Sequence, residues 1–148
     1  MDTSISLAKK TLIFYSILTV PIAFGSFYNL VYGLILGQTS TARIGLFSLF
    51  GFVLLPALII STYRRNKCII QNNKVIIGKK EYPFADYNFK IVNEELAFKD
   101  RPLVSLLKSQ YQRLLIIQRD TNEVELNQEL DILKKDLEQL KSRLPLLT

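Results

Sequence analysis

The hydrophobic and polar positions divide the chain into two unlike parts. No charged residue lies between Lys10 and Arg43, and none lies between Arg43 and Arg64. A membrane-spanning helix needs roughly 20 apolar residues to cross a hydrocarbon layer about 30 Å thick. Both uncharged segments reach that length, so the pattern predicts two spans, at about residues 11–36 and 44–62.

The segment between the predicted spans is short. Gly37 is suited to end the first helix, and Ser40 or Thr41 to begin the next, so the two spans are expected to be antiparallel neighbours. Membrane proteins retain Lys and Arg on the cytoplasmic side of their spans. Only Arg43 lies in the loop, whereas five basic residues flank the outer ends: Lys9, Lys10, Arg64, Arg65 and Lys67. The sequence therefore predicts a multi-pass plasma-membrane protein with both termini in the cytoplasm.

A cleaved signal peptide is the competing interpretation of the first span. Two lysines precede the apolar run, and Ala23 with Gly25 forms a small-x-small site. The apolar run continues to Leu36, well beyond an ordinary signal core, and the second span would remain in either case. We therefore favour a transmembrane helical hairpin over residues 11–62, preceded by a short cytosolic flank at residues 1–10.

Residues 63–148 are rich in charge and predict a folded cytosolic domain. The pair Asn72-Asn73 separates two runs rich in β-branched residues, which predicts a hairpin. Apolar and polar residues alternate over Tyr87–Ile91 and again over Leu96–Phe98. With a turn expected at Asn93–Glu95, this alternation predicts a second strand pair.

The last third of the chain contains a predicted hairpin and a predicted helix. Tyr111–Arg119 and Val124–Leu126 indicate the third strand pair, whereas Arg101–Ser109 fits either a strand or a helical turn. Over residues 127–144, leucines recur at three- and four-residue spacing, as in an amphipathic helix. They are Leu130, Leu133, Leu137, Leu140 and Leu144. The stripe covers only about two heptads, so packing onto the domain's own sheet is favoured over a coiled coil.

These elements predict an α+β protein, in which a two-helix transmembrane hairpin precedes a small cytosolic sheet or barrel with a C-terminal amphipathic helix. The order of strands and helix from Cys68 to Leu144, closed by the segment Asp131–Leu140, resembles the bacterial pleckstrin-homology-like (PH-like) domains found behind one or two membrane helices. The resemblance implies an interaction module. It carries no ligand site, because no matching motif is present.

The inventory of reactive side chains argues against catalysis. The chain has no histidine and one cysteine, which removes the commonest general base and the commonest metal ligand. Cys68 lies beside Lys67, but without a histidine base a conventional cysteine enzyme is excluded and a packing role is favoured. Ser105–Lys108 matches S-x-x-K without its companion motifs. We expect no enzymatic activity, no cofactor and no metal site.

Basic residues are concentrated in the half of the domain nearer the predicted spans. Residues 64–113 contain eleven Lys or Arg and five acids, a net charge of +6, whereas residues 114–148 contain five and seven, a net charge of −2. The candidates for contact with anionic lipid headgroups are Arg64, Arg65, Lys67, Lys74, Lys79 and Lys80. Alternatively, the first three only set the topology and the others are solvated. Nucleic acid is not expected, because the membrane is the nearer anion.

Two functions follow as expectations. The first is a non-enzymatic, membrane-tethered interaction or scaffold module that presents the domain at the cytoplasmic face of a bacterial plasma membrane. The second is an accessory subunit of a larger membrane transport or cell-envelope complex, which acts through its hairpin. In that case the small residues Gly25, Ser26, Gly45 and Gly51 would line the helix contact. The expected partners are the bilayer, anionic headgroups and an unidentified protein.

Overall fold

The structure is a computed structural model, and it describes residues 2–37, 41–95, 99 and 110–147. The chain separates into two compact units. One unit is Leu12–Tyr63, and the other combines Met1–Thr11 with Arg64–Thr148. The beginning of the chain therefore belongs to the same unit as the C-terminal part.

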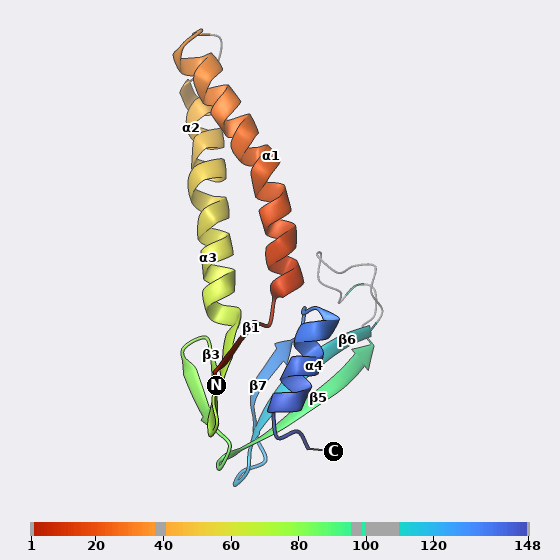
Figure 1. Ribbon diagram of the computed structural model, residues 1–148. Coiled ribbons are helices and arrows are strands. Elements are labelled where there is room, and N and C mark those ends of the chain that lie inside the picture. The colour runs from red at the N-terminus through yellow and green to blue at the C-terminus, as the bar shows by residue number, and fades with distance from the viewer. Residues whose placement is uncertain (1, 38–40, 96–98, 100–109, 148) are drawn as a thin grey trace. The chain divides into compact units, whose positions relative to one another are not determined.

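The first unit is a pair of long apolar helices. Helix α1 (Lys9–Leu34) forms one, and α2 (Thr41–Leu49), the π-helical turn η1 (Phe50–Leu54) and α3 (Leu55–Asn66) follow one another to form the second (Figure 1). Both helices are long and apolar enough to cross a membrane. Only 6% and 11% of their most apolar stretches are buried, whereas the core helix of a soluble protein is mostly buried. These exposed apolar surfaces support the predicted spans.

Local chemistry explains where these helices end and bend. Helix α1 ends at Leu34, slightly before the predicted end at Leu36. Gly37 lies three residues beyond that end with φ +65°, a conformation that glycine adopts without strain. Pro56 has no N–H to donate to the carbonyl four residues earlier. The π-helical turn lies just before it, and the Leu55 N–H donates to the carbonyl of Phe50, five residues back. The proline therefore widens one turn without breaking the helix.

The second unit contains strands in two antiparallel sheets among the residues described. The order in the first sheet is β1-β2-β3-β4. Its strands are β1 (Thr3–Ser6), β2 (Lys67–Ile70), β3 (Lys74–Ile77) and β4 (Lys80–Pro83). Strands β2 and β3 pair on either side of Asn72-Asn73, so the predicted hairpin is confirmed.

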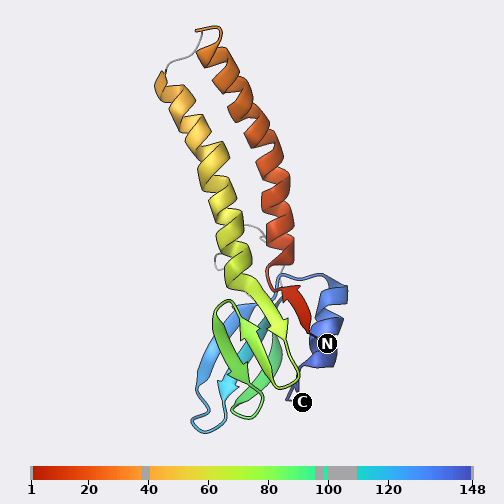
Figure 2. The same ribbon diagram turned by 60° about the vertical axis from the view of Figure 1, so that its left-hand side comes forward.

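Strand β1 is the main difference from the sequence prediction. Its residues pair with β2 from Thr3 opposite Ile70 to Ser6 opposite Lys67, and Figure 2 shows the two strands side by side. The segment expected to be a short flank therefore completes a sheet. Leu7, directly after β1, is fully buried in the core of this unit.

The second sheet has the order β5-β6-β7. Its strands are β5 (Tyr87–Glu95), β6 (Gln110–Gln118) and β7 (Val124–Glu129). The predicted third hairpin is confirmed, but the turn predicted at Asn93–Glu95 is wrong. Strand β5 continues because β6 offers a partner along its whole length, and the Glu94 carboxylate lies 2.8 Å from the Arg113 guanidinium. The predictions for Leu96–Phe98 and Arg101–Ser109 lie outside the described residues.

Helix α4 (Lys134–Arg143) begins later than the predicted 127–144. Asn127–Glu129 extend β7 instead, because β6 supplies pairing partners for them. Leu140 and Leu144 are buried in the core of the second unit, so the expected packing of this helix onto its own domain is confirmed. The α+β class is likewise confirmed.

Candidate functional site

Four of the six predicted basic residues line one groove in the second unit. Arg64 and Arg65 lie at the end of α3, Lys67 opens β2, and Lys79 lies in the turn between β3 and β4. The groove has a volume of about 570 Å³, and Ile77 and Gly78 complete its lining. Residues that are up to 15 positions apart in the sequence are thus brought to one place.

Gly78 allows the turn to approach the junction between α3 and β2. Its φ is +62°, and a Cβ at this position would lie 3.0 Å from the carbonyl oxygen of Arg65. Its N–H donates to the carbonyl of Lys67 over 2.8 Å. Any other residue would be strained in this conformation and would push the turn away from the junction. The close approach of this turn to the junction therefore depends on glycine.

The other two predicted residues, Lys74 and Lys80, are held elsewhere by carboxylates. The Lys74 ammonium lies 2.7 Å from Glu81, and the Lys80 ammonium lies 2.9 Å from Glu125. The hydrogen bond to Glu125 raises the pKa of Lys80 above its ordinary value. The structure thus divides the predicted site into four groove residues and two residues paired on the sheets.

The groove is a concentration of positive charge with a partly apolar wall. Within the described part of the chain, no carboxylate lies within ion-pair distance of Arg64, Arg65, Lys67 or Lys79. Most of its lining surface is apolar, although Ile77 itself is buried in the core of the unit. Such a groove favours an anion with several acceptor oxygens, because guanidinium and ammonium groups bind phosphate and carboxylate by charge-assisted hydrogen bonds.

A second polar cluster, which the sequence analysis missed, involves the first turn of α1. The Lys9 ammonium lies 2.8 Å from a carboxylate oxygen of Asp136, and the Thr11 hydroxyl donates to Asp131 over 2.7 Å. The Lys10 N–H donates to the Asp131 carbonyl over 2.9 Å. Asp131 and Asp136 are both buried. The two aspartates lie close to the leucine stripe in the sequence, and this was the available indication that they face the core.

Cys68 has the packing role that its position predicted. Its side chain is fully buried, and burial raises the pKa of the thiol to about 12. At neutral pH it is therefore a protonated thiol without access to substrate. In the described residues there is no group of three His, Cys, Asp or Glu side chains that could hold a metal ion. Ser105–Lys108 lies outside those residues.

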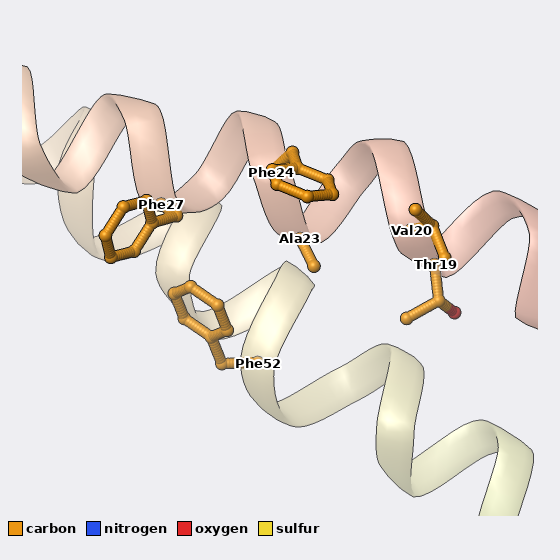
Figure 3. Close-up of a pocket in the computed structure, with 6 residues that line it drawn as sticks. All are labelled: Thr19, Val20, Ala23, Phe24, Phe27 and Phe52. Atoms are coloured by element: carbon orange, nitrogen blue, oxygen red, sulfur yellow. The ribbon is translucent and has the colours of Figure 1, made fainter.

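The helical unit has its own apolar pocket, of about 400 Å³. Figure 3 shows five of its residues along α1 and Phe52 on the facing helix. The hydroxyl of Thr19 donates to the carbonyl of Tyr15 over 2.7 Å, so this polar group is satisfied within its own helix. The pocket therefore presents only apolar surface, which suits a lipid chain or another apolar helix.

Two of the four small residues predicted at the helix contact do meet there. The Ser26 hydroxyl is buried and lies 2.9 Å from the carbonyl of Phe47 on the facing helix. A Cβ on Gly51 would collide with the Ser26 side chain. Gly25 and Gly45 face open space, because nothing lies within 4 Å of a Cβ built on either. The contact thus depends on Ser26 and Gly51.

No protein-family model, curated protein or solved structure matches this chain. Its function is therefore inferred from its own residues and their geometry.

Proposed function

We propose that this chain is a non-enzymatic, membrane-tethered interaction module that presents a PH-like domain at the cytoplasmic face of a bacterial plasma membrane. The apolar helical pair is the tether, and the second unit supplies the interacting surface. Two antiparallel sheets among the described residues, followed by the amphipathic helix α4, support the PH-like interpretation.

The observation that carries this proposal is the pairing of β1 with β2. One strand precedes the helical pair and the other follows it, yet they are neighbours in one sheet. Two spans with paired flanks must begin and end on the same side of the membrane. Because Lys9, Arg64 and Arg65 adjoin those ends, the positive-inside rule favours the cytoplasmic side.

The topology is tested by labelling single cysteines with a membrane-impermeant maleimide. In a Cys68→Ala background, we expect Leu36→Cys, just after the end of α1, to react in intact cells. Thr121→Cys, in an exposed turn of the sheet unit, should react only after the membrane is permeabilised. Labelling of Thr121→Cys in intact cells would place the domain outside and refute the proposal, as would release of the wild-type chain from membranes by alkaline extraction.

The apolar pocket favours a second candidate function, an accessory subunit that acts through its hairpin. Ala23 and Phe52 line this pocket, and a helix of a larger complex could fill it (Figure 3). The two functions differ in what abolishes crosslinking to a partner in native membranes. Ala23→Phe, which fills the pocket, should abolish it only for the accessory subunit. Replacement of exposed residues on the sheet unit should abolish it only for the tethered module.

A further inference from the structure

We propose that the groove lined by Arg64, Arg65, Lys67 and Lys79 binds the phosphate of an anionic phospholipid headgroup. This inference rests on the proposed function, because it assigns a ligand to the residues of the tethered domain that directly follow the second apolar helix in the chain. The ligand would hold the sheet unit against the leaflet into which the helices insert.

Charge is the first reason. Four cations converge on one groove, and among the described residues they have no carboxylate to neutralise them. Lys74 and Lys80 provide the contrast, since each is already paired with a glutamate. A phosphate diester offers oxygens to several donors at once, which matches a cluster of guanidinium and ammonium groups better than it matches isolated lysines.

The place of the groove in the chain is the second reason, and it favours a lipid over a soluble anion. Arg64 and Arg65 belong to the same helix as the apolar residues Leu55–Ile60. A basic residue that directly follows an apolar span lies at the depth of the headgroup phosphates. Most of the lining surface of the groove is apolar, and the glycerol and the first methylenes of a lipid can pack against it.

The backbone of the groove is the third reason. Gly78 lets the β3–β4 turn lie close to the end of α3, with a hydrogen bond from its N–H to the Lys67 carbonyl. Lys79, the next residue in the turn, is consequently brought to the same groove as the two arginines. A backbone that already holds these residues together loses less entropy on binding than a flexible segment would.

The experiment measures lipid binding to the full chain in mild detergent by native mass spectrometry. Phosphatidylglycerol, phosphatidylcholine and inorganic phosphate are added separately at equal concentration. We expect the wild-type protein to retain phosphatidylglycerol in preference to the other two. Lys67→Gln combined with Lys79→Gln should weaken that binding about 25-fold, if each lysine contributes about fivefold. Both arginines are kept so that the topology is unchanged.

The matched control is Lys74→Gln combined with Lys80→Gln, which removes the same charge from the same sheet outside the groove. It should change binding by less than about threefold, because these lysines face glutamates. Should the groove double variant fail to fold, the adjacent single variants Lys79→Gln and Lys80→Gln make the same comparison. Both of these side chains are exposed. Lys79→Gln is expected to weaken binding of phosphatidylglycerol about fivefold, whereas Lys80→Gln is expected to leave it unchanged.

Three results would overturn the inference. They are equal retention of phosphatidylglycerol and phosphatidylcholine, equal losses in the groove and control variants, and binding of inorganic phosphate as tight as that of the lipid. The last result would assign the groove to a soluble anion. A chain that resists alkaline extraction but shows no lipid preference contradicts only this inference, whereas a chain that is extracted contradicts the proposed function.

Discussion

Truncation of Leu7 to alanine tests whether the N-terminal strand is part of the folded core. The Leu7 side chain is fully buried, and its N–H donates to the carbonyl of Asn66 over 2.8 Å. Removing a leucine side chain from a filled core costs about 2–5 kcal/mol, depending on how far the cavity collapses. Because β1 pairs only with β2 in the described sheet, the loss should be felt first in that strand pair.

Cys68 is a built-in reporter for this strand pair. It is the single cysteine of the chain, and it lies opposite Ile5 of β1. Burial raises the pKa of its thiol to about 12, so the native protein is protonated and unreactive at pH 8. Opening of the sheet restores the ordinary thiol pKa of about 8.5 and allows reaction with a disulfide reagent. When reclosing is fast, the labelling rate is proportional to the open population.

We expect Leu7→Ala to accelerate labelling of Cys68 by between about 30-fold and several thousandfold, since each 1.36 kcal/mol is a factor of ten. Ser4→Ala, at an exposed position in β1, is the control and should stay within about threefold of the wild-type rate. The full chain is used in detergent micelles throughout. Equal rates in the two variants would show that Leu7 contributes nothing to the stability of the core around Cys68.

Three further outcomes are expected. Gly51→Ala should lower the free energy of unfolding of the helical pair by about 1–3 kcal/mol through its clash with the facing helix, and unfolding should occur at a lower SDS fraction. Gly45→Ala meets open space and should raise that SDS fraction. Asp136→Asn should lower the free energy of unfolding by only about 1 kcal/mol in thermal unfolding, because water can solvate the half-exposed Lys9 once its partner is gone. An unchanged free energy of unfolding would show that the ion pair between Lys9 and Asp136 is not stabilising. The Cys68 proton is held more tightly in the folded state than in the unfolded state. The contribution of Cys68 to the free energy of unfolding should therefore be fully present below about pH 8.5 and fall as the pH rises toward 12, by up to about 1.4 kcal/mol per pH unit. Cys68→Ala should remove this part of the pH dependence when stability is measured by urea titration.

Local patterns were sufficient to predict the elements whose partners lie nearby in the chain. The apolar segments on either side of Arg43 identify the two long helices, because a span is defined by its own length and hydropathy. The hairpin around Asn72-Asn73 follows from a turn between two β-branched runs. The basic residues of the candidate site could be listed from charge alone, but which of them converge could not.

Pairing between strands decided the element boundaries that the sequence did not predict. Strand β5 runs through Asn93–Glu95 because β6 pairs with it there, although these residues favour a turn. Helix α4 does not begin at Asn127, because β7 extends to Glu129 through its pairing with β6. In both cases hydrogen bonds to a partner strand outweigh a local preference worth less than about 1 kcal/mol.

The N-terminal strand and the groove are the clearest examples of what only the tertiary structure decided. Strand β1 has four residues, too few to show a pattern by themselves, and its partner β2 follows more than 60 residues later. The groove likewise depends on Gly78 lying against the end of α3. Two of the six basic residues, Lys74 and Lys80, are instead held in ion pairs with glutamates. The sequence by itself determined the apolar helices and the sign of the charge, because these are properties of single segments. Which segments meet is set by burial and pairing between residues far apart in the chain, and only the folded structure contains that information.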